Sequence, residues 1–409
     1  MHIAFFNRAF HPEVSATGQL LTELAEGLSR DHGCRVSVVT GWPLGPTCET
    51  WSPPKGWHLV YQERLGPIAV FRARGTTWPK RIFFGRVVNY LTYFGSACLA
   101  GLRLSRPDVV IALTDPPIIG LAALLTARRS RAKLVISYRD IFPEVARLLD
   151  GSRNLLVEQI LRLVNRILIR QADRVVALGE TMRMRLISEK GAPPEKVTVI
   201  PDWADCSAIV PAPKQNSFSA AHGLVDRFVV MHAGNIGAAQ NLEVLVEAAD
   251  HLKGLPDLLF VFIGDGVKKA SLEARADRLG LKNIQFLPYQ PKEELSCTFA
   301  SADCFIVSLK PGLAGYIVPS KVYGILAAGR PYVAAVDEEC EVARIAREYD
   351  CGLLCRSDDP KGLAEKIRLF YENRSLAHRM GVNARQAAPL FDRAKGVKAY
   401  FDLCRELTE

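Results

Sequence analysis

The feature that most constrains the fold is an alternation of short apolar, β-prone segments with amphipathic segments of helical period. In the first half of the chain the β-prone segments are HIAFFN (2–7), RVSVVT (35–40), DVVIALT (108–114), KLVISY (133–138), RVVAL (174–178) and KVTVIPD (196–202). The stretch from Gly18 to Arg30 is typical of the helices expected between them. Strands that alternate with helices predict an α/β protein with a parallel sheet and helices on both faces.

The same alternation starts again after residue 226. Its β-prone segments are RFVVMHAGNIG (227–237), LLFVFIGDG (258–266), NIQFLPY (283–289), CFIVSL (304–309) and PYVAAV (331–336). Pro201, Pro211 and Pro213 mark the connection between the halves. We therefore predict two doubly wound Rossmann-like domains, residues 1–205 and 206–387, which face each other across a ligand-binding cleft, and a last helix at about 388–409 that packs back on the first domain.

The net positive charge of the chain comes entirely from its first half. Residues 1–205 hold 27 lysines and arginines against 18 acids, whereas residues 206–409 hold 25 of each. Residues 64–107 contain no acid and eight basic residues, which are Arg64, Arg72, Arg74, Lys80, Arg81, Arg86, Arg103 and Arg106. A basic domain beside a neutral one predicts that the first domain meets an anionic surface.

Residues 81–104 are predicted to form a helix with one apolar face, made of Phe83, Val87, Tyr90, Leu91, Phe94 and Cys98. Its uncharged run is 16 residues long, from Val87 to Leu102, and a spanning helix needs about 20. We expect a helix on an anionic membrane surface, with a core helix of the first domain as the alternative. Nucleic acid is not an expected partner, because no aromatic and basic interleaving or known motif supports it.

The ten cysteines are scattered, and the closest pair, Cys351 and Cys355, forms no CxxC motif. A zinc site is therefore not expected, and free thiols fit a reducing cytoplasm. The apolar start, MHIAFFNR, has no cleavage-site pattern behind it. It is expected to be a first strand rather than a signal peptide.

Residues 315–334, GYIVPSKVYGILAAGRPYVA, contain a short predicted helix that precedes a strand. Ser320 is expected to cap this helix and Lys321 to begin it. Gly312 and Gly315 lie in the preceding loop, where they allow turns or a close approach of the backbone to a ligand. A lysine at a helix start that follows a glycine loop predicts an anion site.

Several motifs, in their order and spacing, resemble the glycosyltransferases of family four, which have the GT-B fold. These motifs are HAGNIGAAQNLEVLVEAA, FIGDGVKKASLEARADRLGLKNIQFLPYQPKEEL, ASADCFIVSLKPG and VPSKVYGILAAGRPYVA. TDPP (114–117) and RDIFPE (139–144) accompany the VPSK helix in a subgroup that makes bacterial surface polysaccharide and transfers amino sugars, as in O-antigen and colanic acid-type pathways. The resemblance covers nearly the whole chain.

The resemblance implies that the second domain binds a nucleotide-sugar donor. Backbone groups of Leu287 and Tyr289 would read the uracil, and Glu294 would reach a ribose hydroxyl. The other donor-binding candidates lie in strand-to-helix loops and are Gly234, Asn235, Gly237, Gln240, Gly264, Gly312, Gly315, Tyr316, Ser320 and Lys321.

The chain departs from the family pattern at four of its usual charged positions. Tyr316 and Gly324 occupy the positions of two glutamates, and Asn235 and Gln240 align with an arginine and a lysine that grip phosphate. Anion affinity must then come from Lys321, Ser320 and the loop amides. The missing glutamate contact favours a donor with an acetamido group or fewer hydroxyls.

In the first domain, Asp140 follows the β-prone segment KLVISY and is expected to reach the floor of the cleft. There it would orient or deprotonate the acceptor hydroxyl, with helix capping as the alternative role. Glu13, before a turn that ends at Gly18, is the second catalytic candidate. Arg139, Glu13, Gly18 and Asp140 form the predicted acceptor-binding set.

These observations predict a cytoplasmic, metal-independent, retaining glycosyltransferase at the inner face of the membrane. It would transfer a sugar, expected to be an N-acetylamino sugar, from a UDP-sugar donor to a polyprenyl-diphosphate-linked saccharide. No metal is expected, because no Asp-x-Asp pair is available in a cleft loop, and Lys321 would stabilise the departing diphosphate instead. No other cofactor is expected. A UDP-sugar 2-epimerase and a non-catalytic nucleotide-sugar-binding partner are the alternatives; a dehydrogenase is not expected, because HIAFFNRAFHPE lacks GxGxxG.

Overall fold

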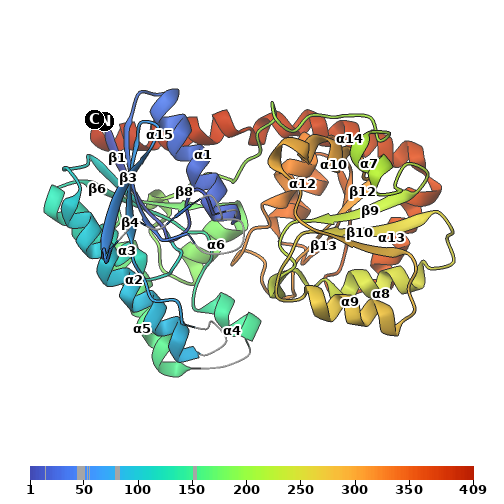
Figure 1. The fold of residues 1–409 in the computed structure, drawn as a ribbon, viewed down its shortest axis with the longest axis horizontal. Coiled ribbons are helices and arrows are strands. Elements are labelled where there is room, and N and C mark those ends of the chain that lie inside the picture. The colour runs from blue at the N-terminus through green and yellow to red at the C-terminus, as the bar shows by residue number, and fades with distance from the viewer. Residues whose placement is uncertain (14, 44–50, 53, 55, 79–82, 151–153) are drawn as a thin grey trace. The chain divides into compact units, whose positions relative to one another are not determined.

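The computed structural model describes the chain except for residues 14, 44–50, 53, 55, 79–82 and 151–153. The chain divides into two compact units (Figure 1). The N-terminal unit comprises residues 1–201 and 393–409, and the C-terminal unit comprises residues 202–392. The chain thus changes unit after Pro201 and again after Asp392, where the sequence predicted boundaries after residues 205 and 387.

The N-terminal unit is built on one sheet with the strand order β3-β4-β2-β1-β5-β6-β7-β8. Its strands are β1 (His2–Phe6), β2 (Arg35–Gly41), β3 (Val60–Leu65), β4 (Ile68–Ala73), β5 (Val109–Leu113), β6 (Lys133–Ser137), β7 (Arg174–Ala177) and β8 (Val197–Val199). All pairs are parallel except β3 with β4. The six predicted strands are confirmed. The β3–β4 hairpin was missed, since charges interrupt the edge strand, VYQERL, which buries only one residue fully.

Helices cover the N-terminal sheet as the alternation requires. They are α1 (Ala16–Arg30), α2 (Phe83–Arg103), α3 (Ile119–Ser130), α4 (Glu144–Asp150), α5 (Leu155–Gln171), α6 (Glu180–Ser188) and α15 (Arg393–Thr408). Helix α3 packs against both α2 and α5 (Figure 1). None of the helices among the described residues combines the length and the apolar character needed to cross a bilayer.

The C-terminal helix α15 packs on α1 of the N-terminal unit. Gly27 permits this contact, because a Cβ atom at that position would lie 2.8 Å from Cγ2 of Val397. The ring of Phe401 stacks on His32 with centroids 4.3 Å apart. The hydroxyl groups of Ser137 and Tyr400 lie 2.8 Å apart. These contacts anchor the end of the chain to the unit in which it begins.

The C-terminal unit contains a parallel sheet with the order β11-β10-β9-β12-β13-β14. Its strands are β9 (Phe228–Ala233), β10 (Leu258–Ile263), β11 (Ile284–Leu287), β12 (Cys304–Ser308), β13 (Tyr332–Ala335) and β14 (Gly352–Cys355). Its helices are α7 (Ser217–Ala221), α8 (Glu243–His251), α9 (Lys269–Arg278), α10 (Leu295–Ala300), α11 (Lys321–Ala327), α12 (Glu341–Glu348), α13 (Pro360–Glu372) and α14 (Arg374–Ala387). Its five predicted strands are confirmed, and β14 was missed.

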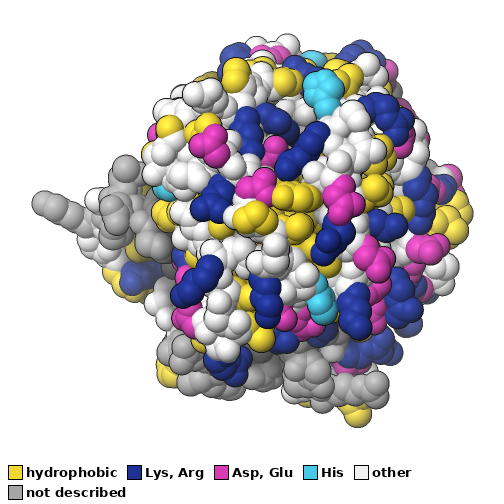
Figure 2. All heavy atoms as spheres, turned by 90° about the vertical axis from the view of Figure 1, so that its right-hand side faces the viewer, with side chains coloured by type: hydrophobic (Ala, Val, Ile, Leu, Met, Phe, Trp, Pro, Cys, Tyr) yellow, Lys and Arg dark blue, Asp and Glu magenta, His cyan; other side chains and the backbone are white. Residues whose placement is uncertain are grey.

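Charges of both signs alternate over the C-terminal unit. Lys268 pairs with Glu243 at 2.7 Å, and Arg379 pairs with Asp350 at 2.8 Å. Figure 2 shows basic and acidic side chains interspersed over the face that it draws. This mixture agrees with the equal numbers of bases and acids after residue 205.

Candidate functional site

Lys321 and His232 form the centre of the candidate site in the C-terminal unit. His232 lies near the carboxyl end of β9, with 1% of its surface exposed. Nζ of Lys321, the first residue of α11, lies 3.2 Å from Nε2 of His232. The ammonium group therefore lies against the end of the central strand of a parallel sheet, where ligands bind in folds of this class.

Burial shifts the protonation of both side chains. Burial and the charge of Lys321 hold the pKa of His232 well below its usual value, so the imidazole is neutral near pH 7. Burial lowers the pKa of Lys321 to about 7. The lysine is consequently only about half protonated at neutral pH, and an anion bound next to it would draw it into the charged form.

Two glycine turns pack backbone against backbone beside Lys321. Gly234 follows β9 with a φ of 123°, and Gly264 follows β10 with a φ of 139°. A Cβ atom on Gly264 would lie 2.0 Å from the carbonyl oxygen of Gly234. A Cβ atom on Gly234 would lie 3.8 Å from Nζ of Lys321. The glycines therefore keep the backbone of both turns close to the ammonium group.

The polar residues of the 234–240 loop hold the loop itself in shape. Oε1 of Gln240 accepts the backbone N–H of Gly237 at 3.1 Å. The carbonyl of Gln240 in turn accepts the hydroxyl of Ser308, at the end of β12, at 2.5 Å. Asn235 is exposed. Gln240, which the resemblance aligns with a phosphate-gripping residue, is thus a loop-stabilising residue in this structure.

The loop that leads into α11 is tied to the neighbouring strand ends. Gly312 and Gly315 both have positive φ, of 79° and 78°. The N–H of Gly312 donates to Asp337, just beyond β13, at 2.7 Å. Lys310 donates its backbone N–H to the carbonyl of Ala239 at 2.7 Å. Tyr316, at the position of a family glutamate, is 8% exposed. The loop therefore belongs to the same edge of the sheet as Lys321.

The predicted N-cap role of Ser320 is wrong. Ser320 has helical torsion angles, φ −67° and ψ −18°, and its side chain makes no capping hydrogen bond. A capping side chain needs an extended backbone to reach the next amide groups, and the preceding loop does not provide one. Because α11 has only seven residues, the case for an anion here depends on Lys321 and the glycine turns rather than on the helix end.

The residues assigned to the uracil and ribose lie beyond β11. The carbonyl of Leu287 accepts the N–H of Gly264 at 3.0 Å, which joins it to the glycine turns. Tyr289 is 44% exposed, and its ring would lie 3.4 Å from a Cβ atom on Gly264. Glu294 is exposed in the 3₁₀ turn Lys292–Glu294. Leu287 and Tyr289 thus join the cluster around Gly264.

A second polar cluster lies in the N-terminal unit, where β1 and β5 end. Arg8 forms a two-pronged ion pair with Glu13, at 2.9 and 3.2 Å. It also lies 3.7 Å from Asp115. Burial disfavours the charge of Arg8, but the two carboxylates outweigh this cost and raise its pKa. Glu13, a catalytic candidate, is therefore paired with a cation rather than held as a base.

Asp140 and Arg139 join this cluster through Thr114. The N–H of Arg139 donates to the Thr114 hydroxyl at 2.9 Å, and that hydroxyl lies 3.3 Å from the carbonyl of Asp140. The side chain of Asp140 is partly exposed. Gly18 is buried, and a Cβ atom on it would lie 3.0 Å from the carbonyl of Glu13. A larger residue at position 18 would crowd the loop that contains Glu13, and this close packing explains the glycine.

Sequence reasoning missed Arg8 and His232 as members of these clusters. Arg8 follows the predicted strand HIAFFN, and His232 lies near the end of the predicted strand in RFVVMHAG. This position at the end of a strand is the signal that could have identified them. Asp115, which the sequence places in a turn, belongs to the ion-paired group as well. Among the described residues, no three His, Cys, Asp or Glu side chains are grouped closely enough to hold a metal ion.

Comparison with known proteins gives two family matches. The family described as "Glycosyl transferase 4-like domain" matches residues 16–203, and "Glycosyl transferases group 1" matches residues 214–387. The chain is 27% identical over 369 residues to "Putative colanic acid biosynthesis glycosyl transferase WcaI" of Escherichia coli (strain K12), a match that covers 87% of this chain and 88% of that protein. It is 30% identical over 274 residues to "Probable glycosyltransferase WbjE" of Pseudomonas aeruginosa, covering 65% and 66%.

The fold is similar to that of a solved structure, Anabaena HepE in complex with UDP and glucose. The TM-score is 0.75 at 18% sequence identity, and the match covers 99% of this chain and 100% of that one. The predicted fold class, GT-B with two Rossmann-like α/β domains, is confirmed by this likeness together with the two parallel sheets.

Proposed function

The chain belongs to the glycosyltransferases of the GT-B fold, and from this premise we propose that it transfers a sugar from a UDP-linked donor to a polyprenyl-diphosphate-linked saccharide during the synthesis of a cell-surface polysaccharide. The names of WcaI and of HepE in complex with UDP support the pathway and the nucleotide. The proposed sugar is an N-acetylamino sugar, because the glutamates that meet hexose hydroxyls in the family are replaced by Tyr316 and Gly324.

The observation that carries the donor assignment is the contact between Lys321 and His232 beside the two glycine turns. In these contacts the ammonium group of Lys321 meets a neutral imidazole and no carboxylate. The diphosphate of the donor supplies the negative charge that such a lysine favours. Amide groups of the glycine turns can approach the phosphates closely, since no side chain shields them.

In the proposed reaction the bond between the sugar anomeric carbon and the diphosphate oxygen breaks. Lys321 stabilises the negative charge that accumulates on the departing UDP. The acceptor hydroxyl oxygen forms the new bond to the anomeric carbon on the same face, so that configuration is retained. Its proton leaves with the diphosphate or passes to Asp140, which is partly exposed near Thr114.

We propose that the N-terminal unit lies on an anionic membrane surface, and exposed apolar residues on α5 support this. Four of them follow one stripe of the helix, Leu156, Ile160, Leu163 and Ile167, and are 36% to 67% exposed. An adjacent stripe carries three exposed arginines, Arg162, Arg166 and Arg170. An apolar stripe beside a basic one suits the interface of an anionic bilayer.

The basic segment 64–107 contributes less surface charge than its composition predicts. Arg72 is 2% exposed and pairs with Glu63. Arg103 donates to the carbonyl of Val60 at 3.0 Å. The side chains of Lys80, Arg81 and Arg86 lie outside the described residues. The predicted attachment through residues 81–106 therefore stays a prediction, and α5 offers a second element for it.

The test is a transfer assay with purified protein, a panel of UDP-sugars and a short-chain polyprenyl-diphosphate saccharide. We expect one UDP-N-acetylamino sugar to give a glycosylated product with retained configuration and free UDP. Formation of a UDP-linked 2-epimer without acceptor would assign the chain to the epimerases instead. Binding of UDP-sugars with no turnover on any acceptor would support the non-catalytic alternative.

A further inference from the structure

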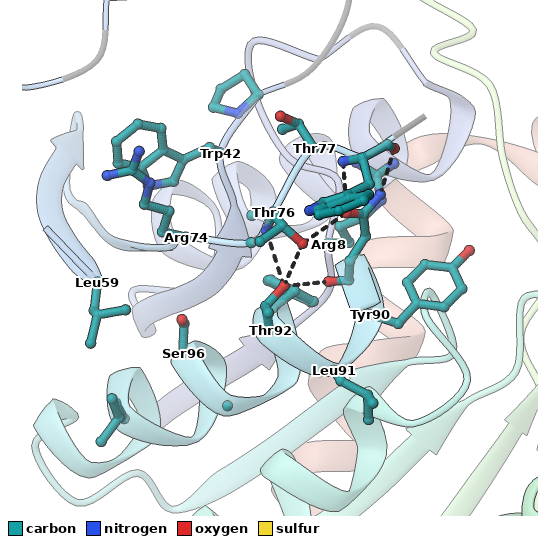
Figure 3. Close-up of a pocket in the computed structure, with 18 of the residues that line it drawn as sticks. Arg8, Trp42, Leu59, Arg74, Thr76, Thr77, Tyr90, Leu91, Thr92 and Ser96 are labelled. Carbon is teal, nitrogen blue, oxygen red and sulfur yellow. Dashed lines mark hydrogen bonds between the residues drawn. The ribbon is translucent and has the colours of Figure 1, made fainter. Parts of the chain in front are cut away.

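A cavity of about 1380 Å³ opens in the N-terminal unit, beside α2 and the β3–β4 hairpin (Figure 3). Its inner wall includes Arg8 and Asp115, of the cluster that contains Glu13. Three of the chain's five tryptophans line it, namely Trp42, Trp57 and Trp78. A cavity of this size accommodates a ligand well beyond a single small anion.

The aromatic wall is partly exposed, and its Trp78 segment is bonded to α2. Trp57 is 70% exposed and Trp78 is 53% exposed. Asn89 of α2 holds the Trp78 segment from both sides, since it accepts the N–H of Trp78 and donates to its carbonyl, each at 3.0 Å. Thr76 bonds to Asn89 and Thr92 of the same helix, at 2.8 and 3.0 Å. The backbone that carries the Trp78 ring is therefore held against α2.

Two buried polar groups of the cavity lining have no hydrogen-bond partner within the described part of the chain. The hydroxyl of Tyr93 is buried, with the residue 3% exposed, and makes no hydrogen bond there. The indole N–H of Trp42 is buried and unbonded as well. Buried donors of this kind cost free energy unless a ligand or water satisfies them. They indicate a ligand that brings hydroxyl groups into the cavity.

Arg74 adds a cation next to the rings. Its guanidinium carbon lies 4.9 Å from the ring centre of Trp42 and 5.9 Å from that of Trp57. Figure 3 shows Arg74 beside Trp42. One cavity thus contains tryptophan rings, the hydrogen-bond donors of Tyr93 and Trp42, and the guanidinium group of Arg74.

We infer that this cavity binds the saccharide of the acceptor, with a pyranose ring on the tryptophan wall and its hydroxyl groups on Tyr93 and Trp42. Arg74 then meets the anionic linkage that carries the saccharide. The inference rests on the proposed function, since it names the site of the acceptor of that reaction. It leaves the donor site around Lys321 unchanged.

The probe is farnesyl-diphosphate-linked N-acetylglucosamine, and farnesyl diphosphate without sugar is the comparison. Quenching of tryptophan fluorescence should report binding of the sugar-bearing probe. Trp57→Ala and Tyr93→Phe should each weaken it at least fivefold, leaving UDP affinity as in the wild type. Met184→Ala, which removes another exposed apolar side chain, on α6, is the control for Trp57. Tyr138→Phe, at a buried tyrosine beside Asn165, is the control for Tyr93.

Equal weakening of both probes in the variants would overturn the inference, because the cavity would then recognise the lipid diphosphate alone. Unchanged affinity in both variants would overturn it as well. Failure of the proposed function would appear differently, as an absence of UDP binding or of sugar transfer in the wild-type protein. Circular dichroism of Tyr93→Phe and Trp57→Ala verifies that each variant is folded.

Discussion

The ammonium group of Lys321 lies 3.2 Å from Nε2 of His232, at the end of a central strand. Both groups are basic, and burial disfavours the charge on each. The pair is stable at neutral pH because the imidazole stays uncharged. A lysine in this state responds strongly to an anion, since binding both neutralises its charge and raises its pKa.

Lys321→Ala should reduce turnover more than donor binding. Charge on the diphosphate grows as the glycosidic bond breaks, so the lysine helps the transition state more than the ground state. We expect a loss of about 2–4 kcal/mol in the barrier, comparable to the loss of one oxyanion-hole donor. Steady-state kinetics with a competent donor measures it. Lys310→Ala is the control, and near wild-type turnover of Lys321→Ala would leave α11 with a structural role only.

Donor affinity should weaken as the pH rises above 7. The pKa of Lys321 is about 7 in the free protein, and a bound diphosphate raises it. Affinity is therefore greatest well below pH 7 and falls by up to tenfold per pH unit above pH 7, until the raised pKa of the complex is reached. Calorimetry with UDP-N-acetylglucosamine from pH 6 to 9 measures the slope, because its diphosphate does not titrate there.

The variant Lys321→Arg separates this cause from general pH effects. Arginine stays protonated throughout the range, so its affinity should be flat with pH. The pKa of His232 is held well below its usual value, so the histidine does not contribute to a change above pH 7. An equal slope in Lys321→Arg and the wild type would show that another group titrates.

Sequence patterns predicted the sheets well and the site only in part. Strands buried on both faces, such as β1 and β9, are continuous apolar runs and were identified. The hairpin strand β3 exposes alternate polar residues at a sheet edge and escaped notice. The contact of Lys321 with His232 joins residues 89 positions apart, and only the strand order brings them together. The cavity was missed for the same reason, since Arg8, Trp42 and Tyr93 come from separate elements.

UDP affinity should be the same with magnesium and with EDTA. The donor site is proposed to neutralise the diphosphate with Lys321 and backbone amides, and no Asp-x-Asp pair was found in the sequence. Titration calorimetry in both buffers measures the two dissociation constants. A large loss of affinity in EDTA would refute metal-independent binding, while the assignment as a glycosyltransferase would stand.

Gly264→Ala should destabilise the C-terminal unit and weaken donor binding. The new Cβ atom would lie 2.0 Å from the carbonyl oxygen of Gly234, at a φ of 139°, so the glycine turns must separate. Gly280→Ala is a matched control, because Gly280 also has positive φ but nothing within 4 Å of its Cβ position. We expect Gly280→Ala to cost about 1 kcal/mol and Gly264→Ala clearly more, measured by urea unfolding. Equal losses would show that the turns tolerate the clash.

Replacement of Leu156, Ile160, Leu163 and Ile167 by serine should release the protein from anionic vesicles. These side chains are exposed on α5, so their replacement leaves the core intact. Each one that enters the bilayer interface contributes up to about 1.5–3 kcal/mol of transfer free energy, and each nearby arginine contributes about 1 kcal/mol on an anionic surface. Flotation with vesicles that contain phosphatidylglycerol measures attachment.

A second variant tests the other candidate element, with Arg81, Arg86, Arg103 and Arg106 replaced by glutamine. If α5 carries the attachment, this variant should float nearly as well as the wild type, because Arg103 already bonds to Val60 within the unit. Replacement of the exposed Leu369 and Val382 by serine in the C-terminal unit controls for general loss of apolar surface. Full flotation of the α5 variant, with loss in the arginine variant, would instead assign the membrane contact to α2 and its flanks. Flotation on neutral phosphatidylcholine vesicles as strong as on anionic ones would remove the electrostatic part of the proposal.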